Sequence, residues 1–121
     1  MKNTLIVLML CFIPTFALAV ESQERLNSFD QIERKGVNAS YYAGVEQAGE
    51  KVTIKVTDKW TKLTGEKKKA FVNQATSLFF GMGGARGFKE AKAMFVVSFI
   101  NKKSGDTVAT WTGMTGAEIY K

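Results

Sequence analysis

The sequence predicts a small α+β domain. Its sheet is expected to be antiparallel, with four or five strands, and covered on one face by a single main helix. Three observations support this class: a segment of alternating polar and apolar residues, a long segment of helical period, and a later apolar run bounded by turn residues. A second, peripheral helix is expected near the N-terminus.

Residues Met1 to Ala19 have the pattern of a secretory signal peptide. Lys2 precedes an apolar run, Pro14 interrupts that run, and Ala17 and Ala19 place small residues before a cleavage point. The apolar run is shorter than the ~20 residues needed to cross a bilayer, which favours a cleaved signal over an uncleaved anchor. We therefore expect export to the periplasm or the medium, and a single domain over residues 20–121.

The segment Ser22 to Lys35 is predicted to be the peripheral helix. Leu26, Phe29 and Ile32 form a thin apolar stripe at three-residue spacing, and Ser22 is a suitable N-cap. Such a narrow stripe indicates docking on the sheet or on a partner.

Two strands are expected next. Tyr41 to Val45 favours a short strand, and Gln47 to Glu50 suits a turn. From Val52 to Thr57, apolar and polar residues alternate, which is typical of a strand buried on one face.

The main helix is predicted within Lys62 to Phe80, and its packed part within Glu66 to Phe80. Thr64 is a candidate N-cap, and apolar residues recur at four-residue spacing on one face. The following segment Gly81 to Gly87 favours a helix end and a loop over a phosphate-binding loop, because phosphate loops precede helices.

The remaining chain predicts three β segments. The segment Ala93 to Asn101 has apolar residues at both odd and even positions, as expected of a central strand that is buried on both faces. Val108 to Trp111 follows a turn and completes a hairpin, and Ala117 to Tyr120 forms a last short strand. We expect Trp60 to pack over Trp111 in the core, and Tyr41 and Tyr42 to be the most exposed aromatic pair.

Composition excludes several chemistries. The chain has no histidine and one cysteine, so it has neither a histidine-based catalytic triad nor a cysteine–histidine zinc site. Among the acids in the middle of the chain (Glu46, Glu50, Asp58, Glu66 and Glu90), none has the apolar sequence context that raises the pKa of a general acid. We therefore expect no enzyme activity, no metal site and no cofactor.

Positive charge is concentrated in the middle of the chain. Residues 51–103 hold twelve Lys and Arg against three Asp and Glu. The candidate anion-binding residues are Lys55, Lys59, Lys62, Lys67, Lys68, Lys69 and Arg86. Lysine predominates over arginine, which favours diffuse attraction over bidentate recognition.

These observations predict a non-catalytic binding or accessory protein of the bacterial cell envelope. Its partner would be an anionic envelope component or an acidic protein, with at most peripheral membrane contact; no nucleic-acid recognition motif accompanies the lysines. The alternative is a structural or interaction module that docks through the first helix or a sheet edge, as a homodimer or as a subunit of an envelope complex.

Overall fold

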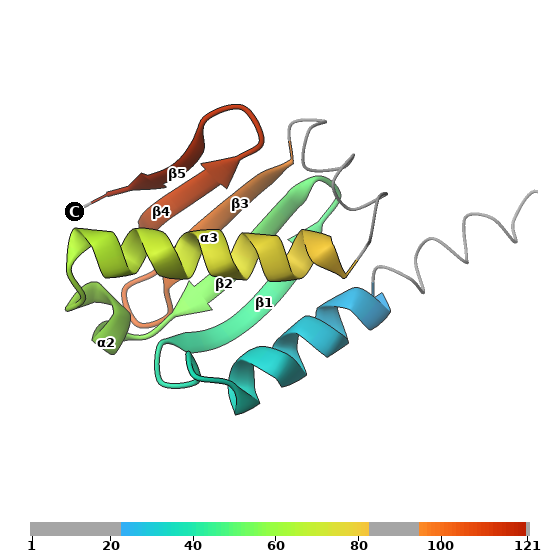
Figure 1. Cartoon of the computed structure of the whole chain (residues 1–121), viewed down its shortest axis with the longest axis horizontal. Coiled ribbons are helices and arrows are strands. Elements are labelled where there is room, and N and C mark those ends of the chain that lie inside the picture. The colour runs from blue at the N-terminus through green and yellow to red at the C-terminus, as the bar shows by residue number, and fades with distance from the viewer. Residues whose placement is uncertain (1–22, 83–94, 121) are drawn as a thin grey trace, which may run out of the picture.

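A computed structural model describes residues 23–82 and 95–120 (Figure 1). An N-terminal helix, α1 (residues 23–35), is followed by two strands, two helices and three strands. The bounds of the later elements are β1 Tyr42–Ala48, β2 Lys51–Val56, α2 Asp58–Thr61, α3 Gly65–Gly81, β3 Val96–Asn101, β4 Thr107–Thr112 and β5 Gly116–Ile119. The predicted α+β class is confirmed. The expected signal peptide and Arg86 lie outside the described residues.

The five strands form one sheet in the order β1-β2-β3-β4-β5. The prediction of an antiparallel sheet is wrong at one pair: β2 and β3 are parallel, with Ile54 opposite Phe99, and the other three pairs are antiparallel. The physical reason lies in the connection. The chain leaves the end of β2 and passes through α2 and α3 over the sheet, and such a crossover returns it to the start of a parallel neighbour.

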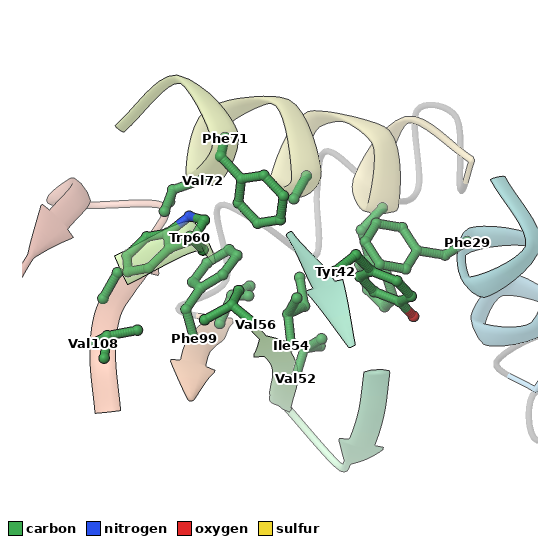
Figure 2. Close-up of a cluster of buried hydrophobic side chains, with 14 of the residues drawn as sticks. Phe29, Tyr42, Val52, Ile54, Val56, Trp60, Phe71, Val72, Phe99 and Val108 are labelled. Carbon is green, nitrogen blue, oxygen red and sulfur yellow. The ribbon is translucent and has the colours of Figure 1, made fainter. Parts of the chain in front are cut away.

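One face of the sheet carries the core (Figure 2). Val52, Ile54 and Val56 alternate along β2 and are fully buried, and Phe71 and Phe79 of α3 belong to the same cluster. Thr53 and Lys55, which point to the opposite face, stay partly exposed. The alternation in the sequence therefore marks the face that α3 covers, as predicted.

The main helix is preceded by a short helix that the sequence analysis did not predict. Thr64 is the N-cap of α3, and its side chain accepts a hydrogen bond from the Lys67 N–H at 3.3 Å. Before it, the single turn α2 carries the fully buried Trp60 into the core. A four-residue helix offers too little periodicity to be recognised in sequence.

The two tryptophans occupy different parts of the core, in contrast to the expectation that they stack. Trp60 packs edge-on against Phe71, whereas Trp111 packs against Phe80. Phe71 and Phe80 are nine positions apart on α3, which is about 13 Å along a helix axis. Of the tyrosine pair, Tyr42 is buried, against the prediction, and Tyr41 is half-buried.

Helix α1 lies beside β1, at the edge of the sheet (Figure 1). Phe29 is fully buried, and its ring contacts Tyr42 of β1 and Phe79 of α3 edge-on, with centroids 5.8 and 5.7 Å away. Ile32, from the same predicted stripe, remains 48% exposed. Phe29 is thus the fully buried residue of the predicted stripe, and Leu26 is partly buried against the same core. In the described part of the chain, no helix is long and apolar enough to cross a membrane.

Candidate functional site

Lysines from three elements meet at one end of the sheet, which we call the basic end. Its members are Lys59, Lys62, Lys67, Lys68, Lys69, Lys102 and Lys103. Figure 1 shows how they come together, because α2, the start of α3 and the β3–β4 turn lie at the same end of the molecule. All of these side chains are exposed except Lys68, which is half-buried. Five of them were predicted from sequence, while Lys102 and Lys103 were not.

A buried asparagine attaches the β3–β4 turn to α2. Asn101 is 6% exposed, and its amide nitrogen donates to Asp58 Oδ1 at 3.1 Å. Its amide oxygen accepts from the backbone N–H groups of Lys103 and Ser104, at 2.8 and 3.1 Å. The Lys103 ammonium then lies 3.7 Å from Asp58 Oδ2. These bonds place two further lysines beside α2, although about forty positions separate them in sequence.

Lys68 has a structural role within the basic end. Its ammonium lies 5.2 Å from the centroid of the buried Trp60 ring, within the range of a cation–π interaction. Because the half-buried Lys68 side chain reaches that ring, a substitution there would change packing as well as charge. The other lysines of the basic end are better probes of binding.

The structure places Lys55 elsewhere. It projects from the uncovered face of the sheet, and its ammonium pairs with Glu46 Oε1 on β1 at 2.8 Å. The alternation of β2 predicts which face Lys55 occupies, but not the carboxylate that the neighbouring strand brings opposite it. Lys55 is therefore a paired cation, whereas Lys59, Lys67 and Lys69 form no ion pair with any residue that the structure describes.

A second charged region is a groove of about 440 Å³ between α1 and β1, which we call the α1–β1 groove. Lys55 lines it, and so does Lys102 of the basic end, where the two regions adjoin. Inside it, Arg34 Nε donates to Asp30 Oδ2 at 2.9 Å, and the Tyr42 hydroxyl donates to Asp30 Oδ1 at 2.6 Å. These two hydrogen bonds lower the pKa of Asp30. Gly44 forms part of the lining, and its backbone has a positive φ of 152°. A Cβ at this position would lie 4.0 Å from Arg34 Nη2. The groove's acids are thus already engaged by the protein's own donors.

Glu33 is a buried carboxyl that the sequence analysis missed. Only 6% of the residue is exposed, and among the described residues its buried Oε2 has no hydrogen-bond partner. Burial raises the pKa of this carboxyl, because the charged form loses solvation. Its position four residues after Phe29 places it on the inward face of α1. This spacing is the sequence signal from which the burial of Glu33 could have been predicted.

Residues 23–82 and 95–120 contain no cluster of three or more His, Cys, Asp or Glu residues that could hold a metal ion. Of the acids considered for catalysis, Asp58 and Glu46 form the pairs described above, and Glu90 lies outside the described residues. No family model matches the chain, and comparisons with curated proteins and with solved structures found no similar protein.

Proposed function

We propose that the protein is a non-catalytic binding or accessory protein of the cell envelope, and that its basic end contacts an anionic partner. The observation that supports this most directly is the gathering of seven lysines from α2, the α2–α3 connection, α3 and the β3–β4 turn. The acids on those same segments are Asp58, Glu66 and Asp106, and Asp58 is already engaged by Asn101 and Lys103. An excess of unpaired, exposed cations attracts polyanions over roughly a Debye length, about 10 Å at 0.1 M salt.

The helix arrangement adds to this attraction. Helix α3 begins at Gly65, so the positive end of its dipole lies among Lys62, Lys67 and Lys69. The lysines are long and flexible, which suits a partner with many similar negative groups. The expected signal peptide supports an envelope or extracellular setting for that partner.

The test compares two charge-neutralised variants of the same net charge. Lys67→Gln/Lys69→Gln alters the basic end and spares Lys68, while Lys35→Gln/Lys51→Gln removes two exposed lysines outside it. Binding is measured by anisotropy of labelled polyglutamate and by co-sedimentation with anionic vesicles and with purified cell-wall material, each at low and high salt. Because each surface lysine contributes about 1 kcal/mol against an anionic surface, the first variant should bind about tenfold or more weakly at low salt.

The control variant should retain most of the affinity, and high salt should weaken the wild type. Equal losses in the two variants would mean that only net charge matters, and the basic end would then not be a site. Binding that high salt leaves unchanged would contradict the electrostatic basis of the proposal.

A further inference from the structure

A small hollow with an apolar floor adjoins the basic end at Lys67. It measures about 180 Å³ and lies between α3 and the turn that enters β1. Its lining consists of Asn38, Tyr41, Leu63, Lys67, Ala70, Phe71 and Gln74. The α3 members and Leu63 recur at three- and four-residue spacing, so they form one continuous stripe beside the lysines.

The floor and the rim of the hollow differ in chemistry. Tyr41 and Phe71 meet edge-on with centroids 6.5 Å apart and, with Leu63, supply the apolar floor. Figure 2 shows the Phe71 ring projecting beneath α3 toward the sheet. At the rim, the Asn38 amide nitrogen donates to Gln74 Oε1 at 3.3 Å, which joins the β1 turn to α3 across the hollow.

Charge and size define what this hollow accommodates. Lys67 is the one charged residue of the lining, and no acid lines it. A cavity of about 150 Å³ accepts a benzene ring, so this volume suits one aromatic or branched aliphatic side chain. A ligand that fits both features carries an apolar side chain flanked by negative groups.

We propose that the hollow binds a hydrophobic side chain of an acidic peptide segment, whose carboxylates contact the surrounding lysines. This inference rests on the proposed function, since the same lysines provide the attraction. A peptide is favoured over a bilayer because the apolar feature beside Lys67 is concave. Peripheral membrane proteins bury protruding apolar side chains in the lipid, whereas a hollow accepts a side chain that protrudes from the partner.

The experiment uses two labelled peptides of equal charge. Each peptide consists of Asp and Glu residues on both sides of one central residue. The central residue is Leu in one peptide and Ser in the other. Burying most of a Leu side chain should make the Leu peptide bind the purified protein about fivefold more tightly or better, as measured by anisotropy. Anionic vesicles, tested in parallel, separate a lipid partner from a peptide partner.

Two leucine substitutions on α3 locate the effect. Ala70→Leu fills the hollow from an exposed lining position and should abolish the preference for the Leu peptide while leaving Ser-peptide binding unchanged. The matched control is Ser77→Leu, two helical turns further along and outside the lining, and it should keep the preference. Thermal melting checks that both variants fold.

The outcomes separate this inference from the proposed function. Equal, salt-sensitive binding of the two peptides would overturn the hollow as a side-chain site and leave the basic end in place. A Leu preference that survives Ala70→Leu would also overturn the hollow. Binding to vesicles but to neither peptide would overturn the peptide partner, and binding to no polyanion at all would remove the proposed function as well.

Discussion

The α1–β1 groove and the basic end both carry many charged side chains, but they differ in how far these charges are paired. In the groove, Arg34 pairs with Asp30, and Lys55 pairs with Glu46. At the basic end, lysines outnumber the acids, and one of these acids, Asp58, is held by Asn101 and Lys103. Paired charges partly neutralise each other within the protein, whereas an unpaired excess remains available to a partner. Changes around α1 should therefore alter stability, and changes at the basic end should alter binding.

The largest expected effect is the loss of the aromatic anchor of α1. Phe29→Ala removes a fully buried ring that contacts both Tyr42 and Phe79. Such truncations cost about 3–5 kcal/mol, which denaturant unfolding would measure. Ile32→Ala, one turn away and 48% exposed, is the control and should cost less than about 1 kcal/mol. A comparable loss at both positions would contradict the view that Phe29 is the anchor.

A smaller effect is expected from the carboxylate in the groove. Asp30→Asn weakens the hydrogen bonds from Arg34 and Tyr42 and should destabilise the fold by about 1–2 kcal/mol near neutral pH. Because folding lowers the pKa of Asp30, its contribution is complete above the ordinary value of 3.8 and disappears as the pH falls through the folded-state pKa. Unfolding free energies of wild type and variant should therefore converge in acid. A difference that persists there would show that Asp30 acts by packing alone.

The smallest predicted change is a gain in stability. Glu33→Gln replaces a buried carboxylate, whose Oε2 has no hydrogen-bond partner among the described residues, by a neutral group of the same shape. Because burying a charge costs more than burying a neutral amide, the change should stabilise the fold by about 1 kcal/mol at neutral pH. Because burial raises the folded-state pKa, wild-type stability attributable to Glu33 is greatest below the ordinary value of 4.5 and is lost as the pH rises through the folded-state pKa. The gain should thus grow above pH 4.5.

The control for this change is Glu24→Gln, at an exposed position on the same helix, and melting temperatures across this pH range should be insensitive to it. A destabilised Glu33→Gln protein would indicate that the carboxylate accepts a hydrogen bond that the amide cannot replace. Asp30 and Glu33, both on α1, thus make the stability of the fold depend on pH in opposite directions.

Most secondary structure could be predicted from the sequence because its signals are local. The alternation from Val52 to Val56 gave β2 and its buried face, and the Thr64 N-cap placed the start of α3 correctly. Five lysines of the basic end were likewise predicted, because they lie within eleven positions along the chain. Five of the seven lysines of the candidate site could thus be predicted before the fold was considered.

The sequence by itself determined the elements, the excess of lysine and the lack of histidine. Only the tertiary structure decided that β2 and β3 run parallel, that Asn101 brings Lys102 and Lys103 to α2, and that Glu46 engages Lys55. It also formed the hollow between Tyr41 and α3 and buried Glu33 on the inward face of α1. The physical reason is common to all of these features. Each depends on which distant segments become neighbours, and periodicity along one segment carries no information about the segment that packs against it.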